Sequence, residues 1–188
     1  MIETIKREVR LAGCLKRDYG NPWLEDEKEN PPPEREKLRV TIDASLQDTD
    51  YVAIKVDDYY NDLRLKNTPS AVDFLVTVDC LDNRYALYLL ELRNVKKPEY
   101  LRLPKVQNKF SNTLSKFMED TFSGIFCNDR FKYRRIRLSL VSNDDVIQKV
   151  KDSLLTDAAL SVKPFSFRGR PLTLKFDSSP NPLIRRIT

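Results

Sequence analysis

The chain has 188 residues, of which 40% are hydrophobic and 32% charged, so it can bury the core of one domain of ordinary size. It contains no histidine, which excludes Ser-His-Asp and Cys-His catalysis, histidine general bases and His-ligated zinc. An enzyme with this composition has to use carboxylates, lysine, arginine, tyrosine or hydroxyl groups, and Mg²⁺ is the ion that suits such oxygen ligands.

Cysteine usage and hydropathy indicate a cytoplasmic protein without a membrane partner. Cys14, Cys80 and Cys127 are widely spaced and odd in number, as expected for reduced thiols. The longest apolar run, Tyr85 to Leu90, is far shorter than the ~20 residues of a membrane helix. The first residues show no basic head followed by a long apolar stretch, so we expect no signal peptide.

Basic charge is concentrated in the middle of the chain. Residues 93–137 contain 12 Lys and Arg against 4 Asp and Glu, although the net charge of the whole chain is only +5. Such a segment is typical of a protein that contacts phosphate groups. A solvated surface would show the same composition, so both interpretations stay open at this point.

In chain order, the first expected element is a short amphipathic helix over residues 2–12, with Ile2, Ile5, Val9 and Ala12 on one face and Gly13 at its end. Residues 25–37 combine a charge run with three consecutive prolines, which indicates an exposed connector. We therefore expect a single domain with an N-terminal region (1–24), this connector, a core (38–176) and an irregular tail (177–188).

The core is expected to alternate strands with helices. Strands are predicted over 38–43, 51–56, 72–80, 84–93 and 133–141, with residues 57–61 as a turn. Helices are predicted over 104–123, ended by Gly124, and from Asn143 to about residue 154. A hairpin over 165–176 turns at Arg168 to Pro171. This pattern predicts an α/β fold with a mixed central β-sheet flanked by helices.

Two acidic residues are predicted to meet across the hairpin formed by 72–80 and 84–93. If its turn is centred on Asp82, Asp73 lies opposite Glu91, with Cβ atoms ~5 Å apart, and Arg93 shares their face. Two carboxylates among apolar neighbours repel each other, and a Mg²⁺ ion held by both and by the Leu92 carbonyl would relieve the conflict. The alternative is a strand-end carboxylate pair neutralised by Arg93 without a metal.

The segments Pro69 to Asp73 and Glu91 to Arg93 resemble the signature of the PD-(D/E)XK nuclease superfamily, over roughly residues 51–141. The resemblance implies a restriction-endonuclease-like fold and a nuclease that hydrolyses phosphodiester bonds, in DNA, with Mg²⁺ or Mn²⁺ held by Asp73 and Glu91. It also implies a homodimer, because small nucleases of this type often cut both strands as dimers.

Arg93 stands where the family has lysine, and Pro69 lies further from the aspartate than usual. Arginine is a poor proton acceptor. Either Arg93 therefore serves only electrostatically, or Lys96, Lys97 or Lys55 reaches the site from elsewhere, or the enzyme is weak or inactive. The alternative is a catalytically inactive nuclease fold that serves as a nucleic-acid- or protein-binding module.

Several basic residues are candidates for nucleic-acid contacts. Lys105, Lys109 and Lys116 share one stripe of the predicted helix 104–123, while Gln107 lies on the other flank of its core stripe. Gln107 and Lys109 are the candidates for reaching the carboxylates. Further candidates are Arg134, Arg135 and Arg137 in a basic, aromatic run, and Arg168 and Arg170 beside the glycine turn. A solvated helix face, a charged strand edge and an exposed hairpin tip are the respective structural alternatives.

Overall fold

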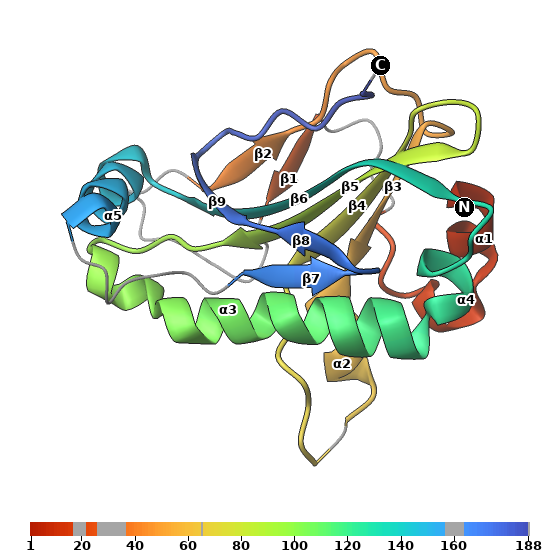
Figure 1. Ribbon diagram of the computed structural model, residues 1–188, viewed down its shortest axis with the longest axis horizontal. Coiled ribbons are helices and arrows are strands. Elements are labelled where there is room, and N and C mark those ends of the chain that lie inside the picture. Colours follow the sequence, from red (N-terminus) through yellow and green to blue (C-terminus); the bar gives the residue numbers. More distant parts are fainter. Residues whose placement is uncertain (17–21, 26–36, 65, 157–163, 188) are drawn as a thin grey trace.

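The computed structural model describes residues 1–16, 22–25, 37–64, 66–156 and 164–187. Of residues 154–156 it describes the backbone only. The connector predicted at 25–37 lies almost entirely outside the described residues. A mixed five-stranded sheet forms the centre of the molecule (Figure 1), in the order β3-β4-β5-β6-β9. Its strands are β3 (Tyr51–Lys55), β4 (Phe74–Asp79), β5 (Arg84–Leu92), β6 (Lys132–Ser142) and β9 (Leu174–Ser178).

The sheet changes from antiparallel to parallel at β5. Strands β3, β4 and β5 pair in antiparallel fashion, whereas β5, β6 and β9 run parallel. In the β4–β5 hairpin Phe74 pairs with Leu90, which is the predicted register. The predicted fold class, a mixed central sheet flanked by helices, is therefore confirmed. Register matters here because a slip of one residue would send every side chain to the opposite face.

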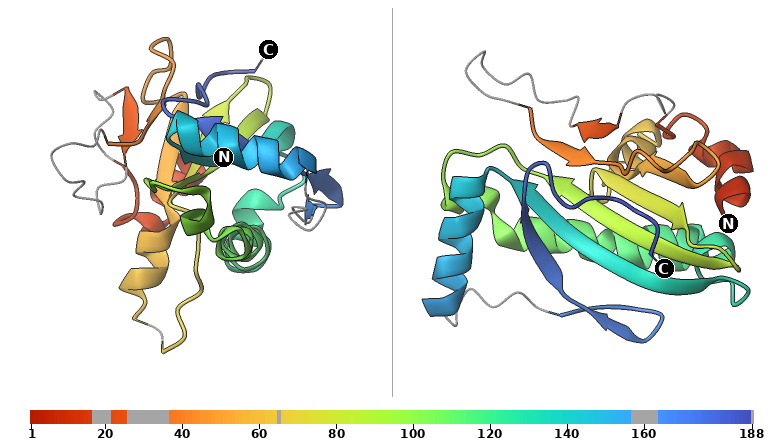
Figure 2. Two further views of the ribbon diagram at one scale, coloured as in Figure 1. Left: turned by 90° about the vertical axis from the view of Figure 1, so that its left-hand side faces the viewer. Right: turned by 90° about the horizontal axis from the view of Figure 1, so that it is seen from above.

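One face of the sheet is covered by a long helical segment (Figures 1 and 2). It comprises α3 (Leu103–Asn112), η3 (Thr113–Thr121), which has π-helical geometry, and α4 (Ser123–Phe126). Val106, Phe110 and Phe117 of this segment pack into the larger core cluster with Leu87 and Leu89 of β5. Burial of this apolar stripe fixes how far the helix is rotated about its own axis, and so which polar residues face the sheet.

Smaller elements complete the same layer. They are α1 (Ile2–Arg7), η1 (Val9–Leu11), α2 (Val56–Asp62) and η2 (Pro98–Leu101). The hairpin of β7 (Phe165–Phe167) and β8 (Arg170–Leu172) also packs there, and α5 (Asp144–Thr156) lies at one end of the sheet (Figure 1). The opposite face is covered by β1 (Trp23–Glu25) and β2 (Arg39–Thr41), whose Leu24 and Val40 join a second core cluster with Tyr88 and Leu90.

Two predicted helix details are wrong. Val9 does not face the core, because Glu8 adopts an extended conformation and starts a separate 3₁₀ turn. Leu11 is buried instead, whereas 84% of Val9 is exposed. Gly124 does not end the long helix, because Phe122 interrupts it and the chain turns again over Ser123–Phe126. The Phe122 ring packs 4.7 Å from that of Phe117, so core packing sets the break.

Two other segments also differ from the prediction. Residues 57–61 belong to helix α2, where Asp57 and Asp58 occupy the first turn and favour the helix dipole. Tyr59 and Tyr60 of α2 are buried. The predicted hairpin 165–176 ends at Leu172, and β9 then joins the central sheet beside β6. The edge strand beside β6 is thus β9, a segment that the sequence pattern assigned to the hairpin 165–176.

Candidate active site

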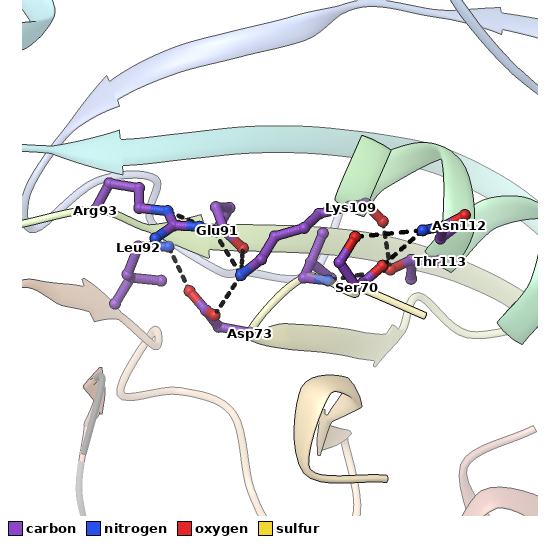
Figure 3. Close-up of polar contacts among 9 residues, drawn as sticks. Ser70, Asp73, Glu91, Leu92, Arg93, Lys109, Asn112 and Thr113 are labelled. Atoms are coloured by element: carbon purple, nitrogen blue, oxygen red, sulfur yellow. Dashed lines mark hydrogen bonds and ion pairs between the residues drawn. The ribbon is translucent and has the colours of Figure 1, made fainter. Parts of the chain in front are cut away.

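Asp73 and Glu91 converge at the end of the β4–β5 hairpin (Figure 3). Asp73 directly precedes β4, and Glu91 is the penultimate residue of β5, so the register places them opposite each other. The Leu92 N–H donates a hydrogen bond of 2.7 Å to Oδ2 of Asp73. Glu91 shares the β5 face of Leu87 and Leu89, which is the face covered by α3. The two carboxylates therefore point into the space between sheet and helix.

Lys109 of α3 enters the space between these carboxylates. Its Nζ lies 2.7 and 2.9 Å from the two Glu91 carboxylate oxygens and 3.4 Å from Oδ1 of Asp73. Arg93 closes the group from the strand side, with Nε 2.7 Å from Oε1 of Glu91. We call Asp73, Glu91, Arg93 and Lys109 the carboxylate cluster. Its side chains come from the residue before β4, from β5, from the residue after β5 and from α3.

Burial dominates the electrostatics of the cluster. Glu91 is fully buried, while 14% of the Asp73 side chain and 36% of the Arg93 side chain are exposed. Burial raises the pKa of Asp73 well above its usual range, and the charge of Glu91 raises it further, against the opposing effects of Lys109 and the Leu92 N–H. Burial likewise raises the pKa of Glu91, with Lys109 and Arg93 acting in the opposite direction.

A third acidic residue acts on the pair from a distance. The charge of Asp57, in the first turn of α2, contributes to the raised pKa of both Asp73 and Glu91. Within the described part of the chain, however, no three Asp, Glu, Cys or His residues lie close enough together to hold a metal ion jointly. A cation bound here would take two protein carboxylates and complete its shell with backbone oxygen and water, which Mg²⁺ commonly does.

The segment before Asp73 is fixed to the helix that carries Lys109. The Val72 N–H donates to the buried Thr113 hydroxyl (3.1 Å), which in turn donates to the Lys109 carbonyl (2.9 Å). Asn112 Nδ2 donates to the carbonyl and the hydroxyl of Ser70 (3.0 and 3.3 Å; Figure 3). These bonds set both the height and the rotation of α3 over the carboxylates.

Comparison of the chain with protein-family models, with curated proteins and with solved structures gives no match. The described residues also contain no helix that is both long and apolar enough to cross a membrane.

The predicted helix stripe divides between the cluster and the surface. Lys109 contacts the carboxylates, Lys105 is exposed one turn earlier, and Lys116 is exposed further along. Gln107 is partly buried but lies roughly 200° around the helix axis from Lys109, so the two cannot face the same site. The sequence analysis named Lys109 and Gln107 as the candidates for reaching the carboxylates, and the structure confirms this for Lys109 but not for Gln107. The bridging position of Lys109 between both carboxylates was not predicted.

Two arginines of β6, Arg135 and Arg137, are not on the face of the carboxylate cluster. Arg135 pairs with Ala86 and Arg137 with Tyr88, two residues of the opposite core cluster, so their side chains lie on that opposite face. Arg134 is exposed at a bulge between them and Tyr133. Arg137 forms an ion pair of 2.6 Å with Asp177 of β9.

Arg168 and Arg170 hold the β7–β8 hairpin against β6. Arg168 donates to Asp129 at 2.5 Å and lies over the Tyr133 ring, with its guanidinium 5.9 Å from the ring centre. Arg170 donates to the Tyr133 carbonyl (2.9 Å). These contacts give both arginines a structural role at the hairpin, on an element separate from the carboxylate cluster.

Proposed function

We propose that the protein is a Mg²⁺-dependent nuclease of the PD-(D/E)XK type, with Asp73 and Glu91 as metal ligands. The observation that carries the proposal is the convergence of two opposed carboxylates and Lys109 Nζ within 3.4 Å in a largely buried site. The fold supports it, since the resemblance implies a mixed central sheet flanked by helices and the chain has one.

The donor set fits a hard divalent cation. Burial, together with the charge of Asp57, raises the pKa of both carboxylates, so their charged forms would be stabilised by a nearby cation, and Lys109 Nζ already lies between them as one positive charge. Mg²⁺ or Mn²⁺ prefers such oxygen ligands. When bound, the ion would polarise a phosphodiester and lower the pKa of a coordinated water.

Lys109 takes the role that Arg93 cannot. Arg93 stays charged, so it serves to stabilise negative charge on a phosphate. Lys109 has a flexible stem and can leave the carboxylates to orient a water molecule or hold a phosphate oxygen. The lysine that the family pattern places on the strand is thus supplied by α3, in preference to Lys55, Lys96 or Lys97.

A second candidate function is a nucleic-acid-binding module without catalysis. The observation that favours it is the neutral balance of the cluster, in which two carboxylates already contact two cations. In this case the cluster would stabilise the fold and the basic middle of the chain would bind phosphate groups. Such a module binds nucleic acid equally well with and without a divalent metal.

Cleavage of labelled oligonucleotides separates the two candidates. The parent should cut DNA with Mg²⁺ or Mn²⁺ and not with EDTA, and Asp73→Asn should lower the rate by at least about a hundredfold. Asp177→Asn is the matched control, because Asp177 is a partly buried, ion-paired carboxylate on the same sheet, and it should cleave within about threefold of the parent. Absence of metal-dependent cleavage of single-stranded DNA, duplex DNA and RNA by the parent would contradict the nuclease proposal.

A further inference from the structure

A basic pocket lies directly beside the carboxylate cluster. It has a volume of about 390 Å³ and is lined by Arg93, Tyr100, Leu101, Arg102 and Lys105. Its volume falls within the ~300–1,000 Å³ of sites that take small ligands or single groups of larger ones. Arg93 belongs to both features, since Nε contacts Glu91 while the side chain lines the pocket. A group bound in the pocket would thus lie next to the carboxylates.

The lining selects an anion. Three of the five lining residues are cationic and none is acidic, so a phosphate group would meet complementary charge. The pocket also lies at the start of α3, whose first residues add a partial positive charge. Arg102 has a left-handed backbone (φ 50°) and connects η2 to α3 at this point.

Tyr100 adds a recognition element that phosphate alone does not require. Of its surface, 56% is exposed, and it is the one aromatic residue among the exposed large hydrophobic residues of the described chain. Leu101 beside it is buried and forms an apolar part of the lining. An exposed ring next to cations is the combination that stacks a nucleic-acid base while its phosphate is held. A base inside a duplex already has both faces covered, so only an unpaired base can stack on Tyr100.

We propose that this pocket binds one unpaired nucleotide of a nucleic-acid strand, with its base on Tyr100 and its phosphate held by Arg102 and Lys105. The inference rests on the proposed function in one respect, that a bond next to the bound nucleotide is cleaved. Binding of the nucleotide itself requires no cleavage. It makes single-stranded nucleic acid, or an unpaired segment of a duplex, the preferred substrate.

The test measures binding by fluorescence anisotropy in EDTA, so that no strand is cut. Single-stranded DNA and a duplex of the same sequence are titrated with the parent, Tyr100→Ala, Tyr100→Phe and Lys105→Ala, with Lys149→Ala as the control for an exposed lysine on α5. Tyr100→Ala should weaken single-strand binding about tenfold with little change on the duplex, and Tyr100→Phe should stay within about twofold of the parent.

The salt dependence of binding separates the contribution of the Tyr100 ring from that of the Lys105 charge. For single strands, Lys105→Ala should reduce the slope of log affinity against log salt by about 0.7, the value for one phosphate contact, whereas Tyr100→Ala should leave the slope unchanged. Equal losses in Tyr100→Ala and Tyr100→Phe, or equal losses on single strand and duplex, would overturn the proposal, as would unchanged binding in Tyr100→Ala.

A competition arm distinguishes a strand from a free nucleotide, which offers the same phosphate and base. We expect a nucleoside monophosphate to displace the strand only at a concentration at least a hundredfold above the Kd of the strand. This result would support a nucleic-acid strand as the ligand of the pocket. Displacement near that Kd would reassign the pocket to a free nucleotide and overturn the proposal. Because these measurements exclude metal, Tyr100-dependent binding without any cleavage activity would contradict the proposed function alone.

Discussion

Two ion-pair groups on opposite faces of the same sheet differ in how their charges meet. On one face Arg137 contacts Asp177 at 2.6 Å and donates to Ser139 at 3.1 Å, a simple pair of opposite charges between neighbouring strands. On the other face the carboxylate cluster places Asp73 opposite Glu91, two like charges from neighbouring strands. Like charges directly opposed on a sheet are destabilising, so the second arrangement requires compensation.

Of these two groups, the carboxylate cluster is the one that carries potential chemistry. An isolated pair such as Arg137–Asp177 joins β6 to β9 and needs no ligand to explain it. The carboxylate cluster gathers charges from separate elements, and burial raises the pKa of both of its acids. Strongly perturbed carboxylates with specific charged partners mark functional sites more often than ordinary ion pairs do. Substitutions in each group show whether the two differ in function or only in geometry.

The largest effect is expected from removing the cation between the acids. Lys109→Met should lower the cleavage rate by roughly a hundredfold to a thousandfold, the usual loss when one charge-stabilising donor is removed from an active site. The measurement is single-turnover cleavage of a labelled single-stranded oligonucleotide with Mg²⁺. Lys149→Met serves as the control, and a rate in Lys109→Met within threefold of the parent would exclude Lys109 from the reaction.

Binding of Mg²⁺ should stabilise the folded protein through the carboxylate cluster and not through the Arg137–Asp177 pair. At a Mg²⁺ concentration near 100 times its Kd, a ligand adds about 2.7 kcal/mol to the free energy of unfolding, and for a chain of this size that raises Tm by roughly 5–10 °C. Differential scanning fluorimetry should show this rise in the parent and in Asp177→Asn but not in Asp73→Asn. A similar rise in all three proteins would place the metal outside the carboxylate cluster.

The bonds that hold α3 over the cluster should show a smaller effect on stability. Thr113→Val leaves the buried Val72 N–H without its acceptor, at a cost of about 1–3 kcal/mol in the free energy of unfolding. Ser115→Ala is the control, because Ser115 is an exposed residue of the same helix and its loss should stay within about 0.5 kcal/mol. Urea denaturation measures both, and equal values would remove Thr113 from the positioning of the site.

The β4–β5 hairpin could be predicted because its determinants are local. Two strongly apolar strands and a short turn fix the pairing register of the hairpin, and this register places Asp73 opposite Glu91. The position of Lys109 was less accessible to sequence reasoning. The stripe of Val106 and Phe110 predicts which side of α3 is buried, but the contact with Glu91 depends on the height of the helix, which the Thr113 and Asn112 bonds fix.

The misassigned elements depend on contacts between distant residues. Helix α2 was predicted as a turn because two aspartates and an asparagine dominate its local composition. It is held by Tyr59, whose ring packs 5.4 Å from that of Phe117. Strand β9 was assigned to a hairpin because parallel pairing with β6 involves residues more than thirty positions apart. The pocket lined by Tyr100 was missed for the same reason, since η2 carries no periodic signal of its own.

A last prediction concerns the stability of the metal-free protein as a function of pH. Because the pKa of Asp73 is raised in the folded state, the folded protein holds this proton more tightly than the unfolded chain does. The corresponding stability is fully present below the unfolded pKa, near 3.9, and is lost as the pH rises through the folded pKa. Asparagine resembles the protonated acid and cannot lose the proton.

Asp73→Asn should therefore gain stability relative to the parent as the pH rises from about 4 to 8, by about 1.4 kcal/mol for each unit of pKa shift. Urea denaturation in EDTA at several pH values measures this difference. Asp177→Asn should show the opposite sign at pH 7, since it breaks a partly buried ion pair and leaves Arg137 without its partner. If both variants lost stability equally at pH 7, the carboxylate cluster would be as well compensated as the Arg137–Asp177 pair, and the argument for cation binding at Asp73 and Glu91 would fail.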